Sequence, residues 1–247
     1  LEMDGVHFVT YPGRYTYTEC ENRVRFKSER MQNTVLVEKG HYPSIENSWG
    51  YHWVAKPLSI QMKKEEALYY FEAQWSIPMK DNETSSRAYV SRKMILDTQA
   101  KLLLVIDEEE SGHALAQNFI IPTKHSNDVY SRFWTNGEMV TEAIQYSKRY
   151  NSLDEGIQLK IRNKKDPIFT CIALEPYSVE KESIPRLDCP GEERGTKIKC
   201  KTKSGELTIY YSPEDIHNGL KYLKDSNGNI VYGRMVAEKN NQKIRFR

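Results

Sequence analysis

The chain has 247 residues, 38% of them apolar, so it is long enough for one large domain or two smaller ones with a substantial core. Its 36 Lys and Arg nearly balance its 34 Asp and Glu, and both signs alternate along the sequence, which leaves no single-sign surface for a nucleic acid backbone. The longest apolar run, 102–106, is far short of the roughly 20 residues that a membrane-spanning helix needs. We therefore expect neither nucleic acid nor a membrane as a partner.

Alternation of apolar and polar residues with period two recurs through the first two thirds of the chain, as in 69–77, and predicts strands with one buried face. Turn signals such as Pro12-Gly13 and Asn136-Gly137 separate these runs at short intervals. The pattern predicts an all-β fold, a large antiparallel two-sheet β-sandwich, with no helix longer than two turns. The expected strands are 7–11, 14–18, 23–28, 34–38, 58–62, 69–77, 89–96, 101–107, 114–121, 157–161 and 168–174.

The composition then changes to Pro, Glu and Lys, which breaks regular elements and predicts a linker or long loop over 176–195. We expect 1–175 to be the β-sandwich domain. In 196–247, hairpins are predicted around Ser204-Gly205 and Asn227-Gly228. We expect these hairpins to complete the sandwich; a small separate subdomain is the alternative.

The four cysteines include no C-x-x-C pair, so their spacing does not support a structural zinc site. Cys20 and Cys171 are expected to be buried as small hydrophobic residues. Cys189 and Cys200 flank a turn rich in Pro and Gly and are candidates for a disulfide in an exported protein, although two free thiols fit the sequence equally well.

Several short motifs follow one another in the first half of the chain. Residues 11–15 read Tyr-Pro-Gly-Arg-Tyr, and 32–34 read Gln-Asn-Thr. Ser-Arg-Lys-Met at 91–94 and Leu-Leu-Val-Ile-Asp at 103–107 precede Phe-Ile-Ile-Pro at 119–122. Their order and spacing resemble the C-terminal β-sandwich domain of heparinase II/III-like polysaccharide lyases, over roughly the first 125 residues.

The resemblance implies a protein that cleaves an acidic, uronate-containing polysaccharide by β-elimination. In such lyases the substrate carboxylate is neutralised, a side-chain base removes the C5 proton, and an acid protonates the leaving glycosidic oxygen. The two catalytic groups are typically a Tyr from an α/α-toroid domain and a His from the sandwich. This chain contains no toroid, so the resemblance implies a fragment that is inactive without the toroid domain of its natural chain.

Two positions depart from the family pattern. Gln32 stands where the family has His, and Tyr11 stands where it has Asp. An imidazole titrates near neutrality and transfers protons, whereas an amide only donates and accepts hydrogen bonds, so Gln32 cannot serve as the base. His41 is the alternative if the alignment is shifted. Some members of the family bind a metal, but its ligand positions are not matched here, so the sequence assigns neither a metal ligand nor a cofactor.

Asn33 carries over from the family as a catalytic-site residue that binds the substrate carboxylate, with Gln32 at the family's His position. The alternative for Asn33 is that its side chain caps a neighbouring backbone group. Arg14 and Arg30 are candidates for bidentate pairing with a uronate or sulfate. For both arginines, an ion pair with a nearby glutamate is the structural alternative.

The segment 41–53 packs two His, two Tyr and two Trp into thirteen positions. Trp49 and Trp53 are candidates for stacking on the C–H face of a sugar, and equally for anchoring their loop over the sandwich. The acidic run 107–110, in contrast, is expected to be a solvated turn.

These observations favour the C-terminal β-sandwich domain of a heparinase II/III-like lyase that acts on an acidic polysaccharide. The alternative is a non-catalytic carbohydrate-binding or structural β-sandwich module, which the residues at positions 11 and 32 favour. By resemblance alone, the protein is expected to be secreted or part of the bacterial cell envelope.

Overall fold

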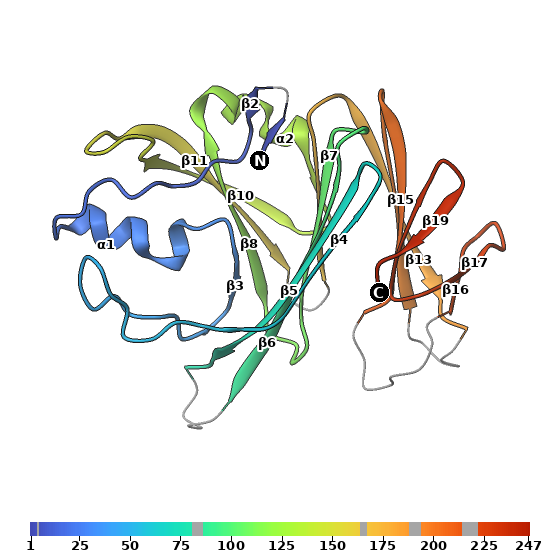
Figure 1. The fold of residues 1–247 in the computed structure, drawn as a ribbon, viewed down its shortest axis with the longest axis horizontal. Helices are drawn as coiled ribbons and strands as arrows, with labels where there is room; N and C mark the ends of the chain where they lie inside the picture. Colours follow the sequence, from blue (N-terminus) through green and yellow to red (C-terminus); the bar gives the residue numbers. More distant parts are fainter. Residues whose placement is uncertain (4, 81–85, 164–166, 188–193, 214–221) are drawn as a thin grey trace. The chain divides into compact units, whose positions relative to one another are not determined.

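The computed structural model describes residues 1–3, 5–80, 86–163, 167–187, 194–213 and 222–247 (Figure 1). These residues form mainly β-strands, which confirms the all-β class. The chain divides into two compact units. Unit 1 comprises Leu1–Gln61, Glu72–Lys93 and Val105–Thr170, and unit 2 comprises Met62–Phe71, Met94–Leu104 and Cys171–Arg247.

The strands are β1 (Glu2–Met3), β2 (Val6–His7), β3 (Val35–Val37), β4 (Pro57–Glu65), β5 (Leu68–Pro78), β6 (Arg87–Asp97), β7 (Leu102–Glu109), β8 (Leu115–Pro122), β9 (Phe133–Thr135), β10 (Glu138–Tyr146), β11 (Asp154–Asn163), β12 (Ile168–Ala173), β13 (Tyr177–Pro185), β14 (Arg194–Thr202), β15 (Gly205–Tyr211), β16 (Tyr222–Lys224), β17 (Ile230–Tyr232), β18 (Met235–Lys239) and β19 (Gln242–Arg245). The helices are α1 (Glu21–Lys27) and α2 (Val129–Arg132), with 3-10 turns η1 (Glu29–Met31) and η2 (Thr123–Asp128). The strands expected between residues 34 and 121 and between 157 and 174 are all confirmed.

Unit 1 contains a four-stranded sheet in the order β10-β11-β8-β3, whose neighbouring strands are antiparallel. A six-stranded sheet has the order β4-β5-β6-β7-β12-β9. Within unit 1 the two sheets meet through buried side chains. Gln117 of β8 donates from Nε2 to the carbonyl of Ile168 at 3.3 Å and accepts a hydrogen bond from the Thr170 hydroxyl. The rings of Phe119 and Phe133 pack 5.5 Å apart.

Helix α1 replaces the strand that the sequence predicted over 23–28. Phe26 is buried against Ile120 and Tyr146, so α1 covers the outer face of the four-stranded sheet (Figure 1). Arg23, Phe26 and Lys27 are all buried at a spacing of three and four, which is helical rather than alternating. The prediction was wrong because two of these buried positions carry cationic side chains, which an apolar pattern does not register.

The strand expected over 14–18 is an irregular segment. Gly13 has φ of 81°, and Tyr15 has φ of 59°, and neither backbone conformation belongs to a strand. Gly13 also lies so close to Ser147 that a Cβ would sit 1.6 Å from the Ser147 carbonyl oxygen. The turn therefore requires glycine for both its conformation and its close approach. At the other early prediction, 7–11, only His7 belongs to a strand.

Unit 2 contains a five-stranded sheet in the order β13-β14-β15-β18-β19. The hairpins predicted around Ser204-Gly205 and Asn227-Gly228 are confirmed as β14–β15 and β16–β17. Strand β13 lies within the segment 176–195, in which a linker or loop was expected, and it pairs with β14 over nine residues. For 177–185 the expectation of a loop was wrong because Pro185 stands at the end of the strand, where a missing N–H interrupts no ladder.

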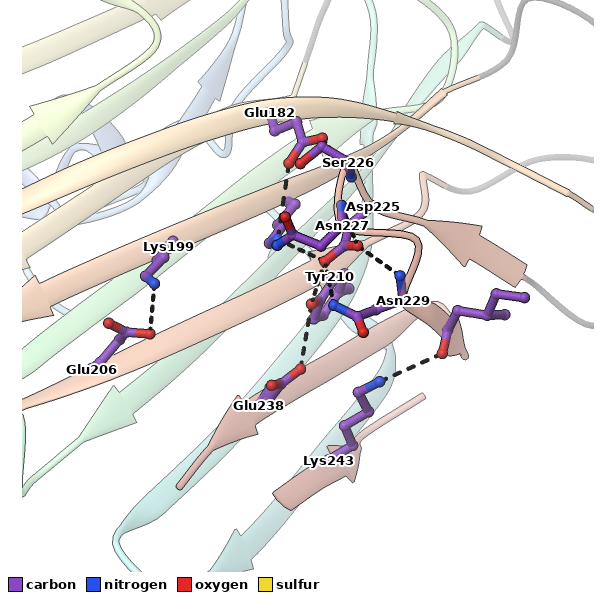
Figure 2. A network of polar contacts seen from close by, with 12 residues as sticks. Glu182, Lys199, Glu206, Tyr210, Asp225, Ser226, Asn227, Asn229, Glu238 and Lys243 are labelled. Atoms are coloured by element: carbon purple, nitrogen blue, oxygen red, sulfur yellow. Dashed lines mark hydrogen bonds and ion pairs between the residues drawn. The ribbon is translucent and has the colours of Figure 1, made fainter. Parts of the chain in front are cut away.

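A buried carboxylate fixes the turn between β16 and β17. Asp225 accepts hydrogen bonds from the backbone N–H groups of Asn227 and Asn229, and from Lys197 Nζ at 2.8 Å. Figure 2 shows Asp225 between this turn and Tyr210, whose hydroxyl lies 3.3 Å from Asp225 and from Glu238. Burial alone would raise the pKa of Asp225, but the bonds from Lys197 and Asn229 hold it well below its usual range.

The cysteines differ in their surroundings. Cys171 and Cys200 are buried in unit 2, and Cys20 is exposed, so the expectation of burial is confirmed for Cys171 and wrong for Cys20. Cys20 precedes α1 as its N-cap residue and projects from the surface. Cys189 lies outside the described residues. A hydrogen bond with Cys200, together with burial, raises the pKa of the Cys171 thiol.

Candidate functional site

The Gln-Asn-Thr motif lies between η1 and β3. Asn33 donates from Nδ2 to the carbonyl of Thr10 at 2.8 Å, and its Oδ1 accepts the N–H of Ile120 at 2.7 Å. Gln32 donates from Nε2 to the carbonyl of Phe26, the last turn of α1, at 3.0 Å. Both side-chain amides thus bond backbone groups of other segments. For Asn33 this is the capping role that the sequence offered as the alternative to substrate binding.

Two other motifs are joined by a buried ion pair. Arg92 of β6 binds Asp107 of β7 in bidentate fashion, with Nε–Oδ1 and Nη2–Oδ2 distances of 2.8 and 2.7 Å. A third guanidinium nitrogen donates to the carbonyl of Asn33 at 2.9 Å. On the neighbouring positions, Lys93 Nζ lies 2.7 Å from Glu108. The prediction of a solvated turn was wrong for Asp107 and Glu108, because both carboxylates have buried cationic partners.

Trp49 and Arg14 come together around a residue that the sequence did not single out. The indole of Trp49 stacks on the ring of Tyr17, with centroids 4.9 Å apart and planes 3° from parallel. Tyr150 packs against the same Tyr17 ring at 6.0 Å. Arg14 donates from Nη1 to the Tyr17 hydroxyl at 3.2 Å. We call Arg14, Tyr17, Trp49 and Tyr150 the aromatic platform.

The platform is open to solvent. Trp49 is 73% exposed, Tyr150 61% and Tyr17 39%. Flat aromatic rings with exposed faces suit the C–H faces of sugars, and the tyrosine hydroxyls and the guanidinium can bind sugar hydroxyls and carboxylates. No ion pair with Glu19 or Glu29 engages Arg14 among the described residues; its guanidinium faces the tyrosine instead.

Helix α1 positions the Trp49 loop with two cationic side chains. Arg23 donates from Nη2 and Nε to the carbonyl of Ser48, at 2.6 and 3.1 Å, and its guanidinium lies 5.5 Å from the Tyr17 ring centre. Lys27 Nζ donates to the carbonyls on both sides of Trp49, those of residues 47 and 50, at 2.8 and 2.9 Å. Burial, and then the charge of Arg23, lowers the pKa of Lys27. The helix thus fixes the backbone on either side of an exposed indole.

The other two candidates line separate hollows. Trp53 lies beside His41, with ring centres 5.9 Å apart, and both border a hollow of about 550 Å³ together with Arg87. Arg30 is exposed and borders a different hollow of about 420 Å³. Of the four predicted substrate-binding residues, Trp49 and Arg14 therefore lie at one site, whereas Trp53 and Arg30 each border a different hollow.

Within the described residues, no group of three or more His, Cys, Asp or Glu side chains is arranged to hold a metal ion. The same part of the chain has no helix that is long and apolar enough to cross a membrane.

Sequence reasoning missed the residues that complete the platform. Tyr17 was assigned to a strand, and Tyr150 lies 133 positions further along the chain, so no local pattern connects them. Arg23 and Lys27 were also missed. Their four-residue separation on a segment beginning with Glu21 was the available signal for a helix with one cationic face.

The molecule is thus an all-β protein with a sandwich of antiparallel sheets and an exposed aromatic and cationic surface. Its fold is that of part of known polysaccharide lyases. A heparinase III gene product has a TM-score of 0.53 and 13% identity, over 83% of this chain and 34% of its own. Heparan sulfate lyase HepC from Pedobacter heparinus has a TM-score of 0.56 and 12% identity, over 87% of this chain and 36% of its own.

Such identities show a shared fold, and this chain spans about a third of the length of those enzymes. No protein-family model matches the sequence, and no curated protein matches it.

Proposed function

We propose that this chain is the C-terminal β-sandwich portion of a heparinase II/III-like polysaccharide lyase, and that it binds an acidic polysaccharide through the aromatic platform. The shared fold with heparinase III and heparan sulfate lyase structures supports the first part. The order of the sequence motifs supports it independently. In this proposal an α/α-toroid domain of the same natural chain forms the opposite wall of the cleft, and the protein is secreted or lies in the cell envelope.

The observation that carries the binding role is the stacked pair Tyr17–Trp49, which remains exposed although Arg23 and Lys27 hold the backbone of the Trp49 loop. A hydrophobic anchor would be covered; this indole presents most of its surface to solvent. Because the loop is held before any ligand arrives, little conformational entropy is lost on binding. Arg14 at the edge of the rings supplies a positive charge for a uronate carboxylate.

The isolated chain is proposed to bind without turnover. Elimination requires a base for the C5 proton and an acid for the leaving oxygen, and Gln32 offers neither. The side chain of Asn33, the other residue carried over from the family, already bonds two backbone groups. These contacts also favour the second candidate function, a carbohydrate-binding module with no catalytic role.

Binding can be tested by calorimetric titration with uronate-containing oligosaccharides, both heparan sulfate fragments and unsulfated ones. Trp49→Ala is expected to weaken binding by about 5- to 30-fold, since stacking on an aromatic ring contributes on the order of 1–2 kcal/mol. Tyr150→Ala is expected to weaken it less. Tyr130→Ala is the matched control, because Tyr130 and Tyr150 are both 61% exposed and only Tyr150 belongs to the platform.

Equal affinities of the parent, Trp49→Ala and Tyr130→Ala proteins would reject the platform. Turnover is followed by the ultraviolet absorbance of unsaturated uronate. We expect none from this chain alone, and product formed by the chain alone would contradict the assignment as one wall of a shared site. Activity that appears only when the natural toroid is joined to this chain would separate a lyase from a binding module.

A further inference from the structure

We propose that the hollow bordered by Arg30, Lys39 and Lys80, here called the Arg30 pocket, binds an oxyanion, either the sulfate or the carboxylate group of a sugar. The assignment of that anion to a sugar rests on the proposed function, whereas the affinity for an oxyanion follows from the pocket itself. The volume of about 420 Å³ lies within the usual range for small-ligand sites.

A tyrosine with fixed hydrogen bonds, Tyr42, is among the residues that line the Arg30 pocket. The Tyr42 hydroxyl accepts a hydrogen bond from the backbone N–H of Val37 and donates one to the carbonyl of Val37 at 3.4 Å. Gly40 makes room for this ring, because a Cβ there would lie 2.9 Å from the ring edge. Burial raises the pKa of Tyr42 to about 12, so the phenol stays neutral at ordinary pH and adds no negative charge to the pocket lining.

The three cationic residues are attached to well-held backbone. The carbonyl of Arg30 accepts hydrogen bonds from Asn118 Nδ2, at 2.8 Å, and from Gln158 Nε2. The N–H of Lys80 donates to the carbonyl of Lys39 at 2.9 Å, which ties the second and third cationic residues together. Two stretches of the chain, 29–43 and Lys80, thus border one hollow that has three positive charges.

Lys39 adopts a backbone conformation that an ordinary residue avoids. Its φ is 60°, although the next residue, Gly40, could take a positive φ without strain. Such strain is held in place by the surrounding structure, and it is common at binding sites. Here the left-handed residue is the lysine that borders the pocket.

Charge favours an anion over a cation or a neutral sugar. Among the described residues that line the pocket, Glu29 is the one carboxylate, against the three cations. In that part of the chain none of the three has a carboxylate within ion-pair distance. Arginine and lysine are the side chains that bind sulfate and carboxylate groups most effectively, arginine with two parallel hydrogen bonds.

The test is an NMR titration of the whole chain with sodium sulfate, compared with sodium chloride at equal ionic strength. We expect saturable shifts of the backbone amides of residues 37–42 and 80 with sulfate. In the variant Arg30→Gln/Lys80→Gln, the affinity for sulfate obtained from these shifts should fall by at least about tenfold. The matched control is Lys124→Gln/Lys224→Gln, which removes two exposed cations elsewhere and should titrate like the parent.

Oligosaccharides with and without sulfate then identify the source of the anion. A preference for sulfated chains that is lost in Arg30→Gln/Lys80→Gln assigns the pocket to sulfate, and equal binding that is lost in the same variant assigns it to carboxylate. Shifts that fail to saturate, or that persist unchanged in that variant, would overturn the proposal. Trp49→Ala should retain the sulfate response, so failure of the aromatic platform and failure of the Arg30 pocket are distinguishable.

Discussion

Replacement of Arg92 by methionine should destabilise the protein severely. The guanidinium forms two short hydrogen bonds with Asp107, whose side chain is fully buried, and a third with the carbonyl of Asn33. Methionine keeps much of the aliphatic volume but removes all three donors and leaves the carboxylate without its cation. Removing one partner of a buried pair costs about 3–5 kcal/mol, a large part of the roughly 5–15 kcal/mol that stabilises a typical domain.

The assay is urea unfolding at neutral pH, followed by tryptophan fluorescence. Lys160→Met is the control, because Lys160 pairs with Glu142, whose side chain is 50% exposed, and such pairs contribute less than about 1 kcal/mol. The double variant Arg92→Met/Asp107→Leu should recover much of the loss, since it leaves no unpaired charge. If Arg92→Met destabilises no more than Lys160→Met, the buried pair does not have the role assigned to it.

Three further predictions concern other parts of the fold. Gly13→Ala should lower the free energy of unfolding by about 2 kcal/mol or more, because the added Cβ would clash with the Ser147 carbonyl. Gly112 has nearly the same φ, 80°, but open space around it, so Gly112→Ala should cost clearly less when both variants are compared by thermal unfolding. Iodoacetamide should alkylate Cys20 and spare Cys171 in the native protein, as peptide mass spectrometry can show; equal labelling would contradict the burial. Folding lowers the pKa of Asp225, so its contribution to stability is complete above the ordinary carboxylate pKa of about 4 and is lost as the pH falls below that value. Measurement of the unfolding midpoint as a function of pH in the acid range checks this prediction.

The sequence predicted the strands that are rich in buried apolar residues. The stretch 69–77 and the core strands β7, β8, β11 and β12 all carry the apolar residues that their burial requires. Strands β10 and β13 were missed for a common reason. Each lies at the edge of its sheet and exposes most of its side chains, so neither shows apolar alternation.

The candidate site was less predictable than the strands. The sequence showed that 41–53 is rich in aromatic residues. It did not show that Trp49 and Trp53 lie at different places on the surface, because this depends on which loop carbonyls Arg23 and Lys27 bind. Such contacts join a helix to a loop twenty or more residues away. Local propensity carries no information about them.

The motifs that carried the family resemblance form the scaffold of unit 1. Arg92 joins β6 to Asp107 and to the carbonyl of Asn33, and Asn33 in turn bonds the backbone at Thr10 and Ile120. These bonds are independent of the residue at position 32, whose glutamine amide caps the end of α1. A glutamine at position 32, where the resemblance implies a histidine, therefore leaves the scaffold intact but offers no group for proton transfer. Motif order in this chain is thus evidence for the fold, and evidence for binding has to come from surfaces that the motifs do not contain, the aromatic platform and the Arg30 pocket.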